Sequence, residues 1–241
     1  MKKKYLFLLP LLLMPLTACD LSALANKSND EEEQESSEEG AGEQLSFNKE
    51  EVINKLKNYG KTTGFDITFD TKTVSDGETS ENSMEVAMKD NMVWLIQDGE
   101  YTGAEYNETS VTLFTSEDGT AFQTTEYGPE QLEGKTPEEF FDDFLETYTA
   151  FFYFADTYKS LGLTKVRNMV YVNREAAEYS FEFHYGGVGT TYKTYIDDEL
   201  GITLYFFAEA TDTDGSKEST EFKVKTFLSG DQVKKPNINN N

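Results

Sequence analysis

The sequence predicts an α+β protein in which a strongly curved antiparallel β-sheet, a half-barrel, wraps one long aromatic helix and a short N-terminal helix. Two observations lead to this fold class. Apolar and polar residues alternate with a period of two over many short segments, which is typical of strands with one dry and one solvated face. Near the middle of the chain the period becomes helical, and the apolar side of that helix is unusually broad.

The chain begins with the pattern of a secretory signal peptide. Lys2, Lys3 and Lys4 precede an apolar run over residues 5–16 that only two prolines interrupt. A membrane-spanning helix needs about 20 apolar residues, whereas this run has about a dozen. We therefore interpret residues 1–18 as an export signal that is removed.

Leu16, Thr17, Ala18 and Cys19 resemble the bacterial lipobox, in which a leucine and small residues precede a cysteine. The resemblance implies cleavage before Cys19 and a diacylglycerol on its thiol, whose palmitate-like chains anchor the mature protein. An ordinary signal peptide cleaved after Ala18 is the alternative. Cys19 is the only cysteine of the chain, so it cannot close an internal disulfide. We expect an envelope lipoprotein at the cell membrane, outside the cytoplasm.

Residues 19–45 predict an acidic, disordered tether. Between positions 28 and 44 the chain has eight acidic residues and no aromatic or β-branched residue. Such a segment buries too little apolar surface to offset its ordering entropy. A spacer that lifts the domain from the membrane is the simpler interpretation, and a metal-buffering acidic patch is the alternative.

The net charge and the aromatic content indicate what the chain binds and where it folds. The net charge of −24, which loss of the three signal lysines would change to −27, argues against nucleic-acid binding because a phosphate backbone would be repelled. Aromatic residues make up 14% of the chain and, after the signal, begin at Phe47. We predict a single domain over residues 46–236, with a core of substantial size, and a disordered tail over residues 237–241.

A short amphipathic helix is predicted to open this domain. Asn48 can cap it, and Glu51 lies three residues on, as in a capping box. Gly60 is expected to end the helix after its apolar face of Val52, Ile53, Leu56 and Tyr59.

Strands follow from Phe65. Apolar residues alternate with polar ones over 65–69 and 84–88, and again in segments around 179–185, 192–196, 202–206 and 222–224. Asp-Gly pairs lie between apolar runs at positions 76–77, 98–99, 118–119 and 214–215. Because such pairs favour tight hairpin turns, we predict an antiparallel meander of ten or so strands.

One long helix interrupts the strands. Thr136 supplies its cap, Pro137 its first position and Glu139 the third. Gly162 is expected to end it. Its broad apolar side is predicted to pack on the sheet and contains Phe140, Phe141, Phe144, Leu145, Tyr148, Phe151 and Phe152.

Four segments of the last third follow a recognisable pattern: Tyr179–Phe183, Thr194–Leu204, Glu221–Phe227 and Val233–Pro236. They resemble the LolA/LolB-like lipoprotein families, where an aromatic-hydrophobic-Asp strand end meets a Glu-x-Gly turn. The resemblance implies a lipoprotein carrier or receptor fold whose curved sheet encloses a hydrophobic cavity for acyl chains. The carrier of that family has no lipid anchor, and no arginine here matches its ligand-gating arginine. The resemblance is therefore to the lipid-anchored members.

A hydrophobic cleft between the sheet and the long helix is the candidate site. A one-faced apolar sheet opposite an aromatic helix makes either a filled core or an apolar pocket, and both remain open. The residues expected to line the cleft are Phe65, Ile67, Phe69, Phe140, Phe144, Tyr148, Phe181, Phe183, Leu204 and Phe206.

The sequence offers no catalytic pattern, and we predict a protein that is not an enzyme and has no cofactor or metal. His184 is the only histidine and is expected on an exposed strand face, so no histidine-based site can be assembled. Residues 211–215 faintly resemble a calcium loop, but Ala210 would occupy its first ligand position, which favours a hairpin turn. Asp142 and Asp143 are helical neighbours and do not face one another.

The leading interpretation is a monomeric, lipid-anchored module that binds a lipid or acyl chain in the cleft. The alternative is an envelope protein-interaction module with a filled core, acting through loops near residues 101–108 and 185–191, where tyrosines could serve as contact residues. The ligand, any protein partner and the number of membranes of the bacterium stay open.

Overall fold

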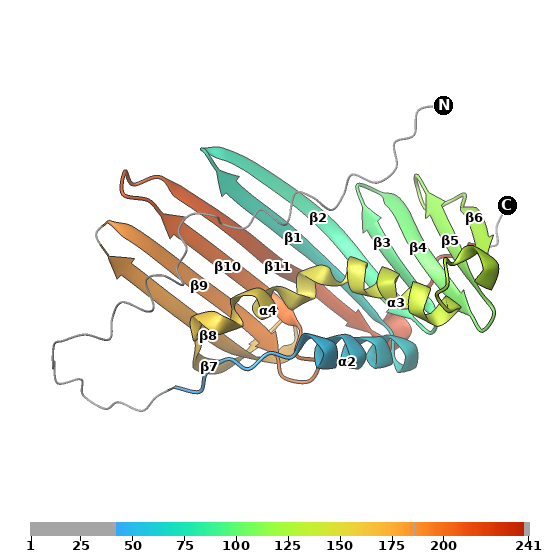
Figure 1. Ribbon diagram of the computed structural model, residues 1–241, viewed down its shortest axis with the longest axis horizontal. Coiled ribbons are helices and arrows are strands. Elements are labelled where there is room, and N and C mark those ends of the chain that lie inside the picture. The colour runs from blue at the N-terminus through green and yellow to red at the C-terminus, as the bar shows by residue number, and fades with distance from the viewer. Residues whose placement is uncertain (1–41, 186, 239–241) are drawn as a thin grey trace. The chain divides into compact units, whose positions relative to one another are not determined.

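The computed structural model describes residues 42–185 and 187–238, all within one compact unit. The predicted signal peptide, the lipobox with Cys19 and most of the predicted tether lie outside the described residues, so those predictions are not tested here. Within the described part, eleven strands form one open antiparallel sheet, and the helices lie on one of its faces (Figure 1). We call the face covered by helices the inner face and the opposite one the outer face.

The sheet consists of two meanders joined side by side. Its strand order is β6-β5-β4-β3-β2-β1-β11-β10-β9-β8-β7, so β1 and β11 join the halves and β6 and β7 form the edges. The strands are β1 (Phe65–Ser75), β2 (Glu78–Lys89), β3 (Met92–Gln97), β4 (Glu100–Asn107), β5 (Ser110–Ser116), β6 (Gln123–Tyr127), β7 (Thr164–Tyr171), β8 (Arg174–Tyr185), β9 (Val188–Asp197), β10 (Thr203–Thr211) and β11 (Lys217–Ser229).

The predicted hairpin positions are confirmed. All four Asp-Gly pairs connect consecutive strands. At the β1–β2 turn, Asp76 and Gly77 have φ of 54° and 77°. A tight turn with positive φ at both central residues matches the twist of the flanking strands, and Asp-Gly tolerates it well.

Helix α2 (Lys49–Thr62) begins as predicted but ends later. The Asn48 side chain accepts a hydrogen bond from the Glu51 backbone N–H at 3.3 Å. Gly60 does not end the helix, because it lies inside α2 where the helix approaches β2. A methyl group at Gly60 would lie 2.7 Å from Met88 Cγ. The glycine therefore permits close packing, and Thr63 caps the helix instead.

The single long helix was a wrong prediction, because the segment is broken at Thr149. Helix α3 (Pro137–Tyr148) is followed by the 3₁₀ turn η3 (Ala150–Tyr153), helix α4 (Phe154–Tyr158) and the 3₁₀ turn η4 (Lys159–Leu161). The buried Thr149 hydroxyl donates to the Leu145 carbonyl at 2.6 Å and lies 2.5 Å from the Tyr153 hydroxyl. This local bonding competes with helix continuation. Gly162 then ends the whole segment with φ of 73°, as predicted.

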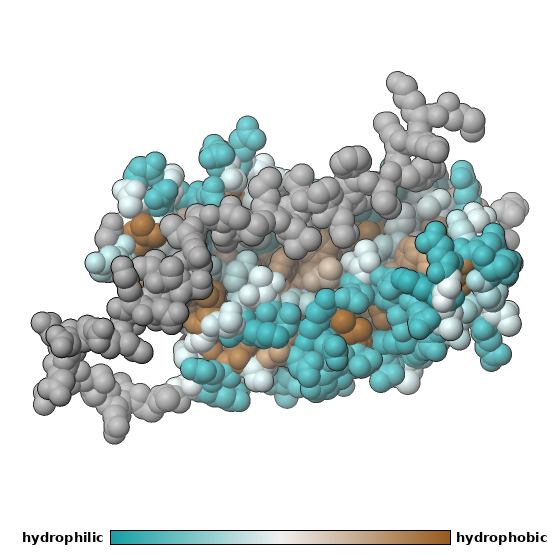
Figure 2. All heavy atoms as spheres, in the orientation of Figure 1, coloured by the Kyte–Doolittle hydropathy of each residue, from teal (hydrophilic) through white to brown (hydrophobic). Residues whose placement is uncertain are grey.

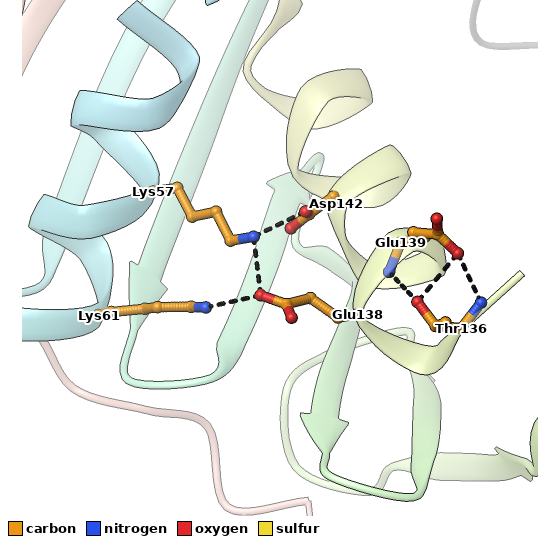
Figure 3. Close-up of polar contacts among 6 residues, drawn as sticks. All are labelled: Lys57, Lys61, Thr136, Glu138, Glu139 and Asp142. Atoms are coloured by element: carbon orange, nitrogen blue, oxygen red, sulfur yellow. Dashed lines mark hydrogen bonds and ion pairs between the residues drawn. The ribbon is translucent and has the colours of Figure 1, made fainter. Parts of the chain in front are cut away.

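Polar contacts begin α3 and tie it to α2 (Figure 3). Thr136 and Glu139 form the predicted capping box, with reciprocal backbone hydrogen bonds of 3.2 and 2.7 Å. Lys57 on α2 lies 2.6 Å from Asp142 and 3.1 Å from Glu138 on α3. Burial of the Lys57 ammonium lowers its pKa, but the hydrogen bonds and charges of the two carboxylates outweigh this and raise the pKa.

The main core lies between the inner face and the helices. Its centre includes Phe65, Ile67, Phe69, Val86 and Met88, all with no exposed surface. Because paired residues share a face, the register of β1 with β2 places Phe65 beside Met88, and Ile67 beside Val86. The alternation in the sequence therefore marks the buried face correctly.

The sheet is strongly curved at the β7 end. Neighbouring strands lie about 4.8 Å apart, so in a flat sheet β7 and β11 would be about 19 Å apart. Yet the Tyr171 hydroxyl on β7 donates a 3.0 Å hydrogen bond to the Val224 carbonyl on β11. One tyrosine side chain therefore reaches across the four steps from β7 to β11, which is possible only if the sheet curves there.

A second, smaller core covers the outer face of β2 to β5. It contains Ala87, Met92, Trp94, Phe114, Phe122, Val233 and Ile238. Val233 and Ile238 belong to the segment that follows the 3₁₀ turn η5 (Gly230–Gln232). The Lys89 ammonium donates hydrogen bonds to the carbonyls of Gly230 and Val233, at 3.0 and 3.2 Å. Burial reaches beyond the predicted domain limits at both ends, since Leu45 is 8% and Ile238 is 6% exposed.

Candidate functional site

The ten predicted cleft residues occupy three environments. Five are completely packed core residues, namely Phe65, Ile67, Phe69, Leu204 and Phe206. Four are partly buried against that core, namely Phe140, Phe144, Tyr148 and Phe181. Phe183 is 36% exposed. They do not converge on one enclosed space.

The space between the sheet and the second helical segment is filled by aromatic side chains. Phe151 and Phe152 lie with ring centroids 5.0 and 5.7 Å from Phe69. Phe154 stacks on Phe206 at 5.2 Å. Tyr158 stacks on the same ring at 4.8 Å. These are normal distances for paired aromatic rings, so this part of the predicted cleft is core.

The aromatic residues of α3 lie at the other end of the sheet. Phe140, Phe144 and Tyr148 form a row with centroid spacings of 5.4 and 5.7 Å. Phe140 also contacts Tyr127 of β6 at 6.3 Å. The predicted helix residues therefore belong to a different region from Phe181 and Phe183 on β8.

The inner face continues past the helices toward the hairpin tips (Figure 1). The strand register places Ala208 between Thr220 on β11 and Tyr192 on β9, and Tyr192 beside Phe181. One row further toward the tips, the register runs from Glu218 through Ala210 and Thr190 to Phe183. Ala208, Ala210, Thr190 and Thr220 are thus the small residues of these rows. The larger ones are Tyr192 on β9, Glu218 on β11 and the two phenylalanines on β8.

Aromatic side chains of the helical segment border these rows. Tyr158 lies 4.9 Å from Tyr192. Phe151, Phe154, Tyr158 and Phe181 are each partly exposed. Figure 2 shows hydrophobic residues between the polar outer surface of the helices and the polar hairpin tips, where grey atoms do not cover that region. We define the inner aromatic surface as Phe151, Phe154, Tyr158, Phe181, Phe183 and Tyr192, with Thr190, Ala208, Ala210 and Thr220.

Sequence reasoning missed part of this surface. Phe181 and Phe183 were among the predicted residues, but Phe154, Tyr158 and Tyr192 were not. The spacing of Phe151, Phe154 and Tyr158 places them on one helical side, a signal that was available in the sequence. Tyr192 could be assigned only once the register of β9 with β8 and β10 was known.

Two cavities in the described part are polar. The first, of about 260 Å³, lies between two turns and is lined by Asn173, Arg174, Glu175, Asp198 and Glu199. Arg174 holds the buried Asp197 carboxylate through two hydrogen bonds of 2.7 and 3.0 Å, and it reaches Glu199 at 2.8 Å. Its guanidinium also lies 4.7 Å from the Phe227 ring. These contacts engage the Nε and Nη2 donors of Arg174, so we interpret this site as a structural clamp.

The second cavity, of about 450 Å³, lies on β1, β2 and β11. Its charged lining residues are three lysines and three carboxylates, namely Lys72, Lys223, Lys225, Asp70, Glu81 and Glu221. None of the ten predicted cleft residues lines either cavity.

The structure also locates the residues that had suggested chemistry. His184 is exposed on β8, as predicted. Asp212 to Gly215 form the turn between β10 and β11, as predicted, with the Asp212 N–H bonded to the Ser216 carbonyl at 2.9 Å. Among residues 42–185 and 187–238, no three His, Cys, Asp or Glu side chains are grouped to hold a metal ion. In the same residues, no helix is long and apolar enough to cross a membrane.

The two segments expected as contact loops are mainly strands. Residues 101–107 belong to β4, where Tyr101 packs on Phe122 and Tyr106 on Phe141. Residues 188–191 belong to β9. Tyr185, at 75% exposure, is the one tyrosine of the proposed contact set that stands out from the surface.

Comparison with known proteins finds similarity to solved structures only. No protein-family model and no curated protein matches the sequence. The chain is similar to PNGF-II at 8% identity and a TM-score of 0.30, over 74% of this chain and 30% of that one. It therefore spans less than a third of PNGF-II.

Two further similar structures concern lipoproteins or the LolA superfamily. An outer-membrane lipoprotein-sorting protein domain from Vibrio parahaemolyticus is 11% identical, covers 79% of this chain and 96% of its own, and has a TM-score of 0.20. A LolA superfamily protein from Nitrosomonas europaea is 9% identical, with 76% and 93% coverage and a TM-score of 0.26. The LolA superfamily is thus named among the structures to which this chain is similar.

Proposed function

We propose that this protein is a lipid-anchored lipoprotein of the bacterial cell envelope that binds an acyl chain on its inner aromatic surface. The observation that carries the proposal is the row of partly exposed aromatic rings beside the small residues of β9, β10 and β11. Soluble proteins seldom leave contiguous apolar surface without a use. The ligand would lie along the surface beside the helices, since the space beneath them is packed.

Several features of the surface suit a linear hydrocarbon. Ala210 and Thr220 present short, partly exposed side chains, so a chain could approach the strands closely there, whereas Ala208 and Thr190 are already buried. The rings of Tyr158, Phe181 and Phe183 would cover it from the sides. Each buried methylene contributes about 0.8 kcal/mol, so a long acyl chain gains more than a small solute from such a strip.

A binding measurement tests the acyl-chain proposal. The full chain, held in phosphatidylcholine nanodiscs, would be titrated with radiolabelled palmitate. Phe181→Ser and Phe183→Ser should each weaken binding about tenfold or more, because each removes a large aromatic contact. Val170→Ser is the matched control, since Val170 is 69% exposed on the β7 edge and lies away from the surface.

The outcome separates the proposal from its rivals. Binding that is lost in the two phenylalanine variants and kept in the valine variant supports it. Absence of palmitate binding, or equal affinity of all three variants, overturns it.

Lipid anchoring rests on Leu16 to Cys19 and has its own test. Cells supplied with labelled palmitate should incorporate the label into the wild-type protein and leave Cys19→Ala unlabelled and released from the membrane. Membrane retention of the unlabelled Cys19→Ala protein would contradict the lipobox assignment.

A second candidate function is protein interaction at the β7 edge. Glu43 and Gln44 pair with the start of this edge at Lys165 and Thr164. Val166 and Val170 follow, at 54% and 69% exposure, and strand edges favour addition of a partner strand. Val170→Lys would then abolish capture of an envelope protein while leaving palmitate binding unchanged. Retained capture would exclude this edge as the interface.

A further inference from the structure

The polar cavity on β1, β2 and β11 lies on the opposite side of the sheet from the inner aromatic surface. Asp70 and Lys72 alternate with the buried Phe69 and so belong to the outer face of β1. The register places Lys223 of β11 beside Asp70, and Glu221 beside Lys72. Helices cover the inner face, so this cavity faces outward from the core (Figure 1).

Ion pairs neutralise part of its lining and leave two groups available. Lys72 pairs with Glu81 at 2.7 Å, and Lys225 pairs with Asp70 at 3.0 Å. Neither Glu221 nor Lys223 forms an ion pair with another described residue within 4.0 Å. The cavity therefore offers a hydrogen-bond acceptor and a donor two residues apart on one strand.

A tyrosine pair borders the same strand. Tyr205 of β10 is the register partner of Lys223, and the charge of Glu221 acts on its hydroxyl. Tyr205 stacks on Tyr195 of β9 with centroids 4.7 Å apart. Burial, and then the charge of Glu221, raise the pKa of Tyr205, so its hydroxyl stays protonated and can donate. Tyr205 does not line the cavity itself, but the register places it directly beside Lys223, which does.

The lining selects among ligand classes. All the residues that line this cavity are polar or charged, which does not favour an acyl chain, and a multivalent anion such as phosphate would meet Asp70, Glu81 and Glu221. A bare metal ion would meet Lys72, Lys223 and Lys225. A neutral ligand with many hydroxyl groups suits alternating carboxylates and ammonium groups, because each hydroxyl both donates and accepts. The volume of about 450 Å³ falls within the usual range for small-ligand sites.

We propose that this outer cavity binds a carbohydrate, with Glu221 accepting and Lys223 donating hydrogen bonds to neighbouring hydroxyls and Tyr205 flanking the sugar ring. The site is separate from the inner aromatic surface and goes beyond the acyl-chain function. It gives the protein a second ligand class, so that one face holds a lipid and the other a glycan.

Calorimetric titration of the full chain in nanodiscs tests this site. The probes are the neutral saccharides chitotriose, maltotriose and cellotriose, with inorganic phosphate as a simple anion. At least one saccharide should bind, and Glu221→Gln and Lys223→Met should each weaken it about tenfold or more, as loss of a hydrogen bond to a charged group does. Glu209→Gln is the matched control, because Glu209 pairs with Lys217 outside the cavity.

Saccharide binding that both cavity variants weaken and the control keeps supports the proposal. Binding of no saccharide, phosphate binding alone, or unchanged affinity in Glu221→Gln and Lys223→Met overturns it. Palmitate binding measured on the same variants should be unaffected, which separates a failure of this site from a failure of the inner aromatic surface.

Discussion

Replacing Arg174 by methionine should be one of the most damaging single changes at the turns of the β7 to β10 region. Arg174 is 15% exposed in its side chain and pairs with Asp197, whose side chain is 1% exposed. Removing one partner of a buried pair leaves an uncompensated charge and costs about 3 to 5 kcal/mol. Asp197 keeps two backbone N–H donors, from Glu199 and Leu200 at 3.1 and 2.6 Å. We therefore expect the low end, about 3 kcal/mol of unfolding free energy.

Urea unfolding followed by circular dichroism measures this loss. Arg167→Met is the matched control, because Arg167 is 63% exposed and its partner Glu178 retains Lys193 at 2.9 Å. The control should lose about 1 kcal/mol or less, because Arg167 itself is exposed and Lys193 still compensates the buried Glu178 carboxylate. Equal losses in the two variants would refute the view that Arg174 clamps the turn through Asp197.

Three further changes probe the packing. Gly60→Ala should destabilise the protein by about 1 kcal/mol or more despite the better helix propensity of alanine, since its methyl group meets Met88. In thermal unfolding, Gly60→Ala combined with Met88→Ala should lose less than the sum of the two single losses, and a stabilised Gly60→Ala would contradict close packing. Thr149→Val removes the hydroxyl that is bonded to Leu145 and Tyr153, and should lower the free energy of unfolding in urea by about 1 to 3 kcal/mol. An unchanged urea midpoint would contradict the view that this hydroxyl stabilises the break in the helix. Burial, then the charge of Asp66, raise the pKa of Glu85 to about 7, so the folded state favours the protonated form. Stability should fall as pH rises from about 4.5 to about 7, by an amount on the order of 1 kcal/mol after solvent screening. Glu85→Gln should flatten that pH dependence in unfolding scans, and an unchanged slope would show that other groups cause it.

Local signals in the sequence predicted much of the fold. The Asp-Gly turns, the Asn48 and Thr136 caps and the buried alternation of Phe65, Ile67 and Phe69 depend on near neighbours, and the structure confirms them. Gly60 was misinterpreted because its role depends on Met88, which is distant in sequence and packs against it.

The candidate site was less predictable because it depends on register and on which face the helices cover. Phe183 follows the same alternation as Phe181, yet it lies further from the helical segment and stays exposed. The second core on the outer face depends on where the segment ending at Ile238 runs, and no local pattern specifies that path. The outer cavity combines β1, β2 and β11, which come together only through the pairing of the two meanders.

Photo-crosslinking of the full chain in nanodiscs with free diazirine-palmitate tests the central claim most directly, because peptide mapping reports where the acyl chain lies. We expect the label on peptides that contain residues 151–158 and 181–192, and we expect unlabelled palmitate to reduce this labelling. Label that is absent from these peptides, or that falls on the outer face of β1 and β11, would contradict an acyl-chain site on the inner aromatic surface.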